Sequence, residues 1–275
     1  MLFTLFGDYV HPLGGREVWV GALVTLAGEF GITSGSLRSA LSRMGREGWL
    51  SKRTVAARPC YGLSRQGREL IEEGTRRIYR TRGGAWDGQW LVVAYSGAGS
   101  RAVRDRLRTE LTFLGFGSLG AGLYLSPHDL RPELAELAGR HGVREVLGVR
   151  GPLALPGDPT AVVRRAWDLD GLARRYRAYI LETERARRQD AELAGEGTLA
   201  PARAFRRRFL LTHHYRHFPY SDPDLPASLL PAGWPGTRAH QLFLDYNALL
   251  LPGAEQHYRE VVDVANHGRT TIRVT

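Results

Sequence analysis

The spacing of apolar residues changes along this chain, and that change sets what the chain can fold into. Up to about Tyr79 the apolar residues follow helical spacing around one short hairpin, whereas Trp90–Tyr95 is a continuous apolar run of strand length. After Pro156 the pattern is helical again. With 275 residues the chain is long enough for about two domains, or three small ones. We therefore predict an α+β multidomain protein.

Glycines and prolines mark the predicted boundaries. Gly83 and Gly84 lie in a predicted linker, and five prolines between Pro219 and Pro235 predict an extended, ordered loop. The predicted parts are a first domain at 1–80, a linker at 81–88, a central domain at 89–156 and a helical C-terminal domain at 157–275. The last is expected to carry effector and dimer contacts.

Periodicity and capping residues place the elements within these domains. In the first domain we predict helices over 2–9, 18–27, 33–47 and 65–79, and strands over 49–54 and 60–63. The central domain is predicted as strand 90–95, helix 101–114, strand 119–125, helix 130–141 and strand 143–149, an order typical of split βαβ domains. Further helices are expected over 170–193, 201–218, 238–250 and 255–264.

Composition excludes several classes of protein. Cys60 is the only cysteine, which excludes an intrachain disulfide and a cysteine-based zinc site. No apolar stretch approaches the roughly 20 residues of a membrane-spanning helix. The apolar N-terminus lacks a cationic region and meets Asp8 at once, so we interpret it as a folded helix rather than a signal peptide. The expected location is the cytoplasm.

The excess of positive charge is concentrated in one segment. The net charge is +10, and residues 33–65 hold seven cations against the single anion Glu47. Such a patch favours nucleic acid as partner. A membrane surface is the weaker alternative, because the apolar residues here have the spacing of a core-facing helix. A merely solvated cationic helix is the other alternative.

The helix predicted at 33–47 has two distinct faces. Leu37, Leu41 and Met44 share one side at 3.6 residues per turn, while serines and arginines occupy the other. Arginine can donate two hydrogen bonds to the edge of a guanine, and serine can form a hydrogen bond with a base edge or a phosphate. This face is therefore suited to binding in the major groove of DNA. The basic hairpin that follows would act as a wing. The predicted DNA-binding residues are Ser36, Arg38, Ser39, Ser42, Arg43, Arg46, Lys52, Arg53 and Arg58.

Several motifs together resemble one known family. They are Leu2-Phe3-Thr4-Leu5-Phe6-Gly7-Asp8-Tyr9-Val10, Trp19-Val20-Gly21-Ala22-Leu23, Leu37-Arg38-Ser39-Ala40-Leu41-Ser42-Arg43-Met44, Trp86-Asp87-Gly88, Trp167-Asp168-Leu169, His213-His214-Tyr215-Arg216 and Asp222-Pro223-Asp224-Leu225-Pro226. This combination is similar to the PaaX family of bacterial transcriptional repressors of phenylacetate degradation. The similarity extends over nearly the full length.

The resemblance implies a fold and a function. It implies an N-terminal winged helix-turn-helix domain, a central ferredoxin-like α+β domain and a helical C-terminal domain. It also implies a homodimer on operator DNA that phenylacetyl-CoA, or a related aryl-acyl-CoA, releases. No cofactor, no metal and no enzymatic activity are expected. Because coenzyme A carries several phosphates, its site needs cations beside an apolar slot. The predicted effector-binding residues are Arg206, Arg207, His213, Tyr215 and Arg216.

The alternative function is an enzyme, either a metal-dependent nuclease or a CoA-thioester enzyme built on the central domain. Against a nuclease, the first central strand ends Ala94-Tyr95-Ser96, without a carboxylate for magnesium. The glycines of 115–120 match G-x-G-x-x-G but follow a helix and precede a strand, the reverse of a dinucleotide site, so we interpret them as a flexible connector. Cys60 is expected to be inert. A partner-binding adaptor without DNA recognition is a third possibility.

Overall fold

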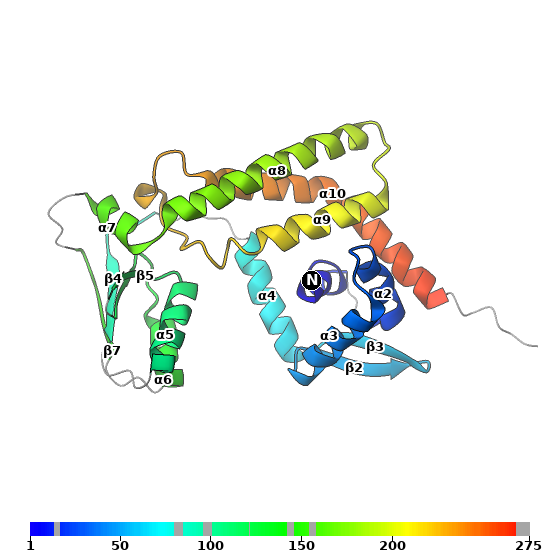
Figure 1. The fold of residues 1–275 in the computed structure, drawn as a ribbon, viewed down its shortest axis with the longest axis horizontal. Coiled ribbons are helices and arrows are strands. Elements are labelled where there is room, and N and C mark those ends of the chain that lie inside the picture. The colour runs from blue at the N-terminus through cyan, green and yellow to red at the C-terminus, as the bar shows by residue number, and fades with distance from the viewer. Residues whose placement is uncertain are drawn as a thin grey trace, which may run out of the picture. The chain divides into compact units, whose positions relative to one another are not determined.

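The computed structural model describes residues 1–13, 17–79, 85–95, 101–120, 122–141, 146–153 and 158–267. The chain divides into two compact units, each built from segments that are distant in sequence. The first unit comprises Met1–Arg80, Glu182–Tyr215 and Gln241–Thr275, and the second comprises Thr81–Leu181 and Arg216–His240 (Figure 1). None of the described helices is long and apolar enough to cross a membrane.

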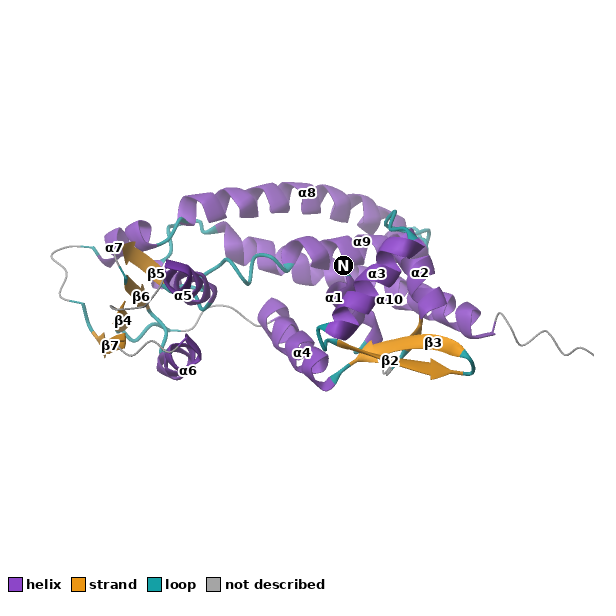
Figure 2. Cartoon of the chain, turned by 60° about the horizontal axis from the view of Figure 1, so that its bottom comes forward, coloured by secondary structure: helices purple, strands orange, loops and turns teal. Residues whose placement is uncertain are grey.

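The first unit opens with short helices around a small antiparallel sheet. Its N-terminal elements are α1 (Leu2–Leu5), the π-helical turn η1 (Phe6–Val10), β1 (Val18–Trp19), α2 (Val20–Gly28), α3 (Ser34–Arg46), β2 (Leu50–Val55), β3 (Arg58–Leu63) and α4 (Arg65–Tyr79). The sheet has the order β1-β3-β2, so β2 lies at an edge. Figure 2 shows β2 beside β3. The predicted elements are confirmed, except that Val18 and Trp19 pair with β3 as a strand instead of starting α2.

Caps and glycines explain the boundaries of these elements. Thr33 accepts a hydrogen bond from the Ser36 N–H at its Oγ1 and begins α3, while Ser64 accepts one from the Gly67 N–H and begins α4. A Cβ at Gly67 would lie 2.1 Å from the Trp49 carbonyl oxygen, so only glycine lets α4 approach the hairpin this closely.

The core of the first unit continues into two distant helices. These are α9 (Pro201–Tyr215) and α10 (Pro235–His267). The same hydrophobic cluster that holds Leu23, Leu37 and Leu41 also holds Phe205 and Phe209 of α9 and Ala254 and Tyr258 of α10. The N-terminal elements therefore share one core with the C-terminal helices.

The prediction of two separate helices over 238–250 and 255–264 was wrong. The structure has a single helix, α10, that continues through Pro252. Leu250, Ala254 and Tyr258 are buried at intervals of four residues across that proline. A Cβ at Gly253 would meet the Ala204 Cβ at 3.0 Å, so glycine allows α9 to pack closely at this point. Packing on α9 overrides the proline, which lacks an N–H and favours a break.

The second unit is built around a four-stranded antiparallel sheet. Its elements in the central region are β4 (Trp90–Tyr95), α5 (Arg101–Phe113), β5 (Gly117–Gly120), β6 (Leu123–Ser126), α6 (Arg131–His141) and β7 (Val146–Gly151). The strand order is β5-β6-β4-β7. The single strand predicted over 119–125 is a hairpin instead, because Gly120 and Gly122 adopt positive φ angles of 99° and 80° and turn the chain.

Each face of this sheet is covered differently. Helices α5 and α6 pack on the face that carries Leu91 and Val93. The opposite face, with Trp90 and Leu125, is covered by α7 (Pro159–Ala166), the start of α8 (Leu169–Gly195) and the segment that holds the turn η2 (Ala227–Leu229). On the edge strand β7, Leu147 and Val149 remain 64% and 55% exposed.

The glycine-rich segment between α5 and β5 has a packing role. It connects a helix to a strand as predicted, but it is not merely flexible. The Trp167 indole packs against Gly117, where a Cβ would lie 2.5 Å from the ring, and its Nε1 donates to the Gly115 carbonyl oxygen at 3.2 Å. These glycines therefore make room for a tryptophan.

Candidate nucleic-acid interface

The predicted two-faced character of α3 is confirmed. Leu37, Leu41 and Met44 are buried in the core of the first unit. The opposite side presents exposed serine and arginine side chains, which are Ser36, Arg38, Ser39, Ser42, Arg43 and Arg46. The buried side fixes the helix to the core, so the polar side faces outward as one continuous surface of hydroxyls and guanidinium groups.

The hairpin β2–β3 extends this basic surface. Every residue of β2 after Leu50 is exposed, including Lys52 and Arg53. The tip is a two-residue turn at Ala56 and Ala57, with φ angles of 47° and 61°. A turn with two positive φ angles matches the twist of the strands, but this conformation is strained for alanine because its Cβ comes close to the following carbonyl oxygen.

The cations of this surface differ in their partners. Arg53 forms a 3.1 Å ion pair with Glu17, and Arg43 lies 3.9 Å from Glu47. The Arg58 guanidinium lies 4.0 Å above the Trp19 ring. Within the ranges that the structure describes, Arg38, Arg46 and Lys52 form no ion pair. An anion that approaches these three side chains would therefore displace no ion pair with a described residue.

Cys60 is buried on β3, within the hairpin β2–β3 itself. Burial raises the pKa of its thiol, so the thiolate that reacts with oxidants is disfavoured.

The predicted effector-binding residues fall in different surroundings. Arg206 is exposed and lies 3.6 Å from Glu29. Arg207 lies 3.3 Å from Asp190, and His213 Nδ1 lies 3.3 Å from the Thr4 hydroxyl. Tyr215 is fully buried and stacks on Phe243 at a centroid distance of 4.2 Å. Four of the five residues belong to the first unit, whereas Arg216 belongs to the second.

Arg208 does not behave as a solvated cation or as a phosphate-binding residue, the two alternatives that its place in an arginine run suggests. Its side chain is buried, donates to the Asp8 carbonyl oxygen at 3.4 Å and lies 4.9 Å above the Tyr9 ring. Burial raises the pKa of the Tyr9 hydroxyl, which keeps the ring neutral beneath the cation. Arg208 therefore fastens η1 to α9.

A second structural cluster surrounds Asp190 of α8, which sequence reasoning missed. Asp190 is fully buried, and its carboxylate accepts hydrogen bonds from Arg203 Nε at 2.7 Å and from the Tyr246 hydroxyl. Arg207 adds a second cation. The only sequence signal was an aspartate on the buried side of an arginine-rich helix. A buried carboxylate needs such partners, so this cluster ties α8, α9 and α10 together.

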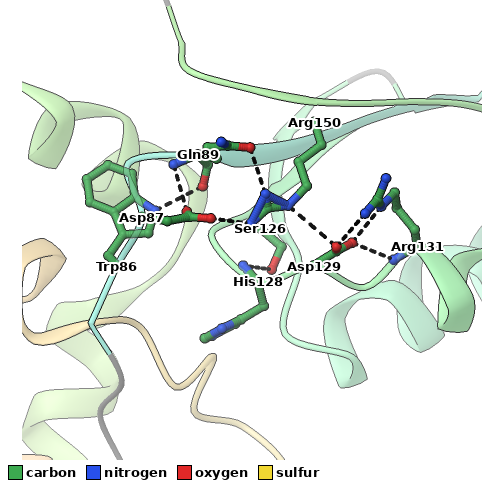
Figure 3. A network of polar contacts seen from close by, with 8 residues as sticks. All are labelled: Trp86, Asp87, Gln89, Ser126, His128, Asp129, Arg131 and Arg150. Atoms are coloured by element: carbon green, nitrogen blue, oxygen red, sulfur yellow. Dashed lines mark hydrogen bonds and ion pairs between the residues drawn. The ribbon is translucent and has the colours of Figure 1, made fainter.

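In the second unit, charged residues near the start of β4 form a network (Figure 3). Arg150 of β7 donates to Gln89 Oε1 at 2.8 Å and to Asp87 Oδ2 at 2.6 Å, and Trp86 Nε1 donates to the Gln89 carbonyl oxygen. Arg131 forks onto Asp129, which lowers the pKa of that carboxyl to about 2. The carboxylates here are engaged by arginines that hold the chain against the sheet.

The described residues offer no metal site. They contain no group of three or more histidine, cysteine, aspartate or glutamate side chains that could hold an ion. Glu110 on α5 contacts His141 Nε2 at 2.7 Å and Arg140 at 3.1 Å. His213 and His217 lie four residues apart, a spacing that would suit two ligands of a metal ion, but no group of three or more possible ligands forms around them within these ranges.

Comparison with known proteins identifies the family. Three family models match in succession: a PaaX-like protein model over residues 1–67, the PaaX protein central Cas2-like domain over 83–161 and the PaaX-like protein C-terminal domain over 167–260. The transcriptional repressor PaaX of Escherichia coli (strain K12) is 33% identical over 276 aligned residues, which cover 99% of this chain and 84% of that protein. The chain belongs to the PaaX family.

A solved structure shares the fold. The uncharacterized protein Rv0674 from Mycobacterium tuberculosis aligns with 86% of this chain and 90% of its own, at 24% identity and a TM-score of 0.56.

Proposed function

We propose that this protein is a DNA-binding transcriptional repressor whose reading head is a winged helix-turn-helix formed by α2, α3 and the hairpin β2–β3. The observation that carries the proposal is the outer face of α3, where serines and arginines are all exposed while the opposite face is buried in the core. The name of the Escherichia coli relative, a transcriptional repressor, supports it.

The geometry suggests a division of roles. The small hydroxyl groups of Ser39 and Ser42 let α3 come close to base edges, and Arg46 on the same face has the length to fork onto guanine. Lys52 on the exposed edge strand β2 would contact phosphate as part of the wing. Phosphate contacts set affinity for any DNA, whereas base contacts set sequence preference.

We propose that the protein binds its operator as a homodimer, held by the second unit and the C-terminal helices. The strand order β5-β6-β4-β7 supports the ferredoxin-like fold proposed for the central domain. Its edge strand β7 carries Leu147 and Val149 on one face with no charge between residues 146 and 149, which suits antiparallel pairing with the same strand of a second copy.

Light scattering tests this interface. Replacing Leu147 and Val149 together by aspartate is expected to yield monomers, because like charges would face each other across the paired strands. Val55→Asp, at an exposed apolar position on the hairpin β2–β3, is the control and should leave the dimer intact. A double variant with the parent's mass would place the interface elsewhere.

We further propose that phenylacetyl-CoA or a related aryl-acyl-CoA releases the protein from the operators of phenylacetate catabolic genes. The side chains proposed to bind the phosphates of coenzyme A are Arg206, Arg207 and Arg216. His213 and Tyr215 lie near them in the sequence. Calorimetric titration should show binding of the thioester and none of free phenylacetate, which lacks phosphates. Arg216→Gln should weaken that binding, whereas Arg165→Gln on the exposed side of α7 should not. Tight binding of free phenylacetate would contradict this assignment.

The function itself is tested with DNA from upstream of the protein's own gene. Fluorescence anisotropy should show tighter binding to that fragment than to a scrambled one, and phenylacetyl-CoA should lower the difference. Incubation with magnesium or manganese tests the enzyme alternative on the same DNA. Equal binding to both fragments, or cleavage of either, would refute a repressor.

A further inference from the structure

The turn that joins α2 to α3 is held from behind by α9 and α10. Glu29 ends α2, and its Oε1 lies 2.6 Å from His257 Nε2 of α10. The other carboxylate oxygen, Oε2, is buried without a hydrogen bond from any described residue and lies 3.6 Å from Arg206 of α9. Only 16% of the Glu29 side chain and 15% of the His257 side chain are exposed, so water screens this contact weakly.

The next residue makes the apolar half of the same contact. The Phe30 ring lies 4.3 Å from the Phe209 ring and 5.9 Å from the Phe205 ring, measured between centroids. Phe205 in turn lies 5.2 Å from the His257 ring. Both α9 phenylalanines are fully buried. Two adjacent turn residues are thus fixed by three aromatic rings and a cation, all within the first unit.

This turn leaves α3 little freedom. The backbone N–H groups of Phe30, Gly31 and Ile32 all donate back into the end of α2. Thr33 follows at once as the N-cap of α3. Any shift of Glu29 and Phe30 relative to α9 is therefore transmitted to the first turn of the helix that carries the exposed serines and arginines.

We propose that Glu29 and Phe30 are positioning residues for sequence-specific DNA binding: their contacts with Arg206, Phe209 and His257 hold α3 at the angle that reads the operator. This inference rests on the DNA-binding function proposed above. Neither residue needs to contact DNA itself. A functional helix must be held to about 0.5 Å by the side chains behind it, and here those side chains come from the C-terminal helices.

Specific and non-specific binding respond differently to such positioning. Phosphate contacts come from flexible cations and tolerate a small tilt of α3. Bidentate contacts with a base depend on the direction of both hydrogen bonds, so they do not tolerate such a tilt. Loosening the turn should therefore lower the preference for the operator while leaving affinity for unrelated DNA and its salt dependence unchanged. A residue that only stabilises the fold would reduce both affinities together.

The experiment uses the full chain with two variants, Glu29→Gln and Phe30→Leu. The first removes the charge that His257 and Arg206 face, and the second replaces the ring that packs against Phe209 by a smaller aliphatic side chain. Fluorescence anisotropy gives the dissociation constants for the upstream fragment and for a scrambled fragment at several salt concentrations. We expect each variant to lose about tenfold in operator affinity, which corresponds to one weakened base contact, with scrambled DNA bound as by the parent.

The matched control is Glu255→Gln, which breaks the 2.8 Å ion pair with Arg259 elsewhere on α10 and makes the same change in charge. It should bind both fragments like the parent. Thermal melting checks that each variant is folded at the assay temperature. Variants that keep the parent's preference, or that lose both affinities in parallel with a fall in Tm, would overturn the positioning role. A parent protein that binds neither fragment would instead refute the proposed function.

Discussion

Single side chains on the proposed DNA-binding surface differ in how firmly they are already engaged. Arg53 and Arg58 are held by Glu17 and Trp19, so each must give up an internal contact before it meets DNA. Arg46 and Lys52 form no such ion pair within the described ranges. They therefore offer the sharpest comparison between base reading and phosphate contact.

Arg46→Ala and Lys52→Ala should have different signatures. If Arg46 forks onto a base, its loss weakens operator binding by about 1–3 kcal/mol and leaves scrambled DNA nearly unaffected. Loss of Lys52 should weaken both and reduce the slope of log affinity against log salt by about 1. Arg76→Ala, which removes an exposed cation paired with Glu73 outside the basic segment 33–65, is the control. Titrations over a range of salt separate these outcomes, and identical behaviour of Arg46→Ala and Lys52→Ala would exclude a base contact.

Gly117 occupies a position where any side chain would collide with the core. A Cβ there would lie 2.5 Å from the Trp167 ring and 2.7 Å from the Ala166 Cβ. Gly117→Ala should therefore destabilise the protein by roughly 1–3 kcal/mol through overpacking. Gly139→Ala, in the open on α6, should instead stabilise it by about 0.5–1 kcal/mol, because alanine favours helix. Urea midpoints measure both, and a rise for Gly117→Ala would contradict this packing.

At the scale of elements, the hairpin β2–β3 combines good strand pairing with an unfavourable turn. Six residue pairs join the strands from Leu50↔Leu63 to Val55↔Arg58. Ala56 and Ala57 close the hairpin with positive φ angles, which cost about 1–2 kcal/mol per non-glycine residue. Backbone strain of this kind is common at functional sites, and here the strained residues lie at the tip of the proposed wing.

Ala57→Gly should remove most of that strain. We expect a net gain of about 0.5–1 kcal/mol, because glycine's greater freedom in the unfolded chain offsets part of it. The same replacement at Ala102, exposed on α5, should cost about 1 kcal/mol. Denaturant midpoints give both values. A loss of stability in Ala57→Gly would mean that the tip is not strained.

Local signals in the sequence predict most of these elements. The period of Leu37, Leu41 and Met44 gave the inner and outer faces of α3, because burial of a single helix face leaves a 3.6-residue pattern. The same reasoning failed at α10, where packing on α9 outweighs Pro252, and at β5–β6, where glycines turn a short apolar run into a hairpin. In both places the deciding contacts are tertiary.

The contacts behind the candidate site could not be predicted in this way. Glu29 and His257 are 228 residues apart, and no periodicity relates them. Arg206, Arg207 and Arg208 look equivalent in sequence, yet one faces Glu29, one Asp190 and one Tyr9. Which partner each arginine meets depends on how α9 is rotated against the rest of the first unit. That rotation is set by Phe205 and Phe209.

At the scale of the whole molecule, the elements proposed to read DNA share their core with the C-terminal helices α9 and α10. Phe205, Phe209 and Tyr258 lie in the same cluster as Leu23 and Leu41. Tyr9 stacks on Tyr258 at 5.6 Å and packs against Phe205 at 4.9 Å, between ring centroids. Burying each such side chain contributes about 1.5–3 kcal/mol. Together, the burial of these side chains contributes an amount similar to the free energy of unfolding of a typical domain, about 5–15 kcal/mol.

A fragment of residues 1–80 should therefore fail to fold cooperatively. Without α9 and α10, Tyr9 and Phe30 lose their aromatic partners, and η1 loses the Arg208 contact. Circular dichroism should show residual helix that melts over a broad range, and operator DNA should be bound no better than scrambled DNA. The comparison is the full chain, which should melt in a transition that includes the near-ultraviolet signal of Tyr9 and Tyr258. If the fragment melts sharply and still prefers the operator, the shared core is dispensable. The positioning of α3 would then lie within the first 80 residues alone.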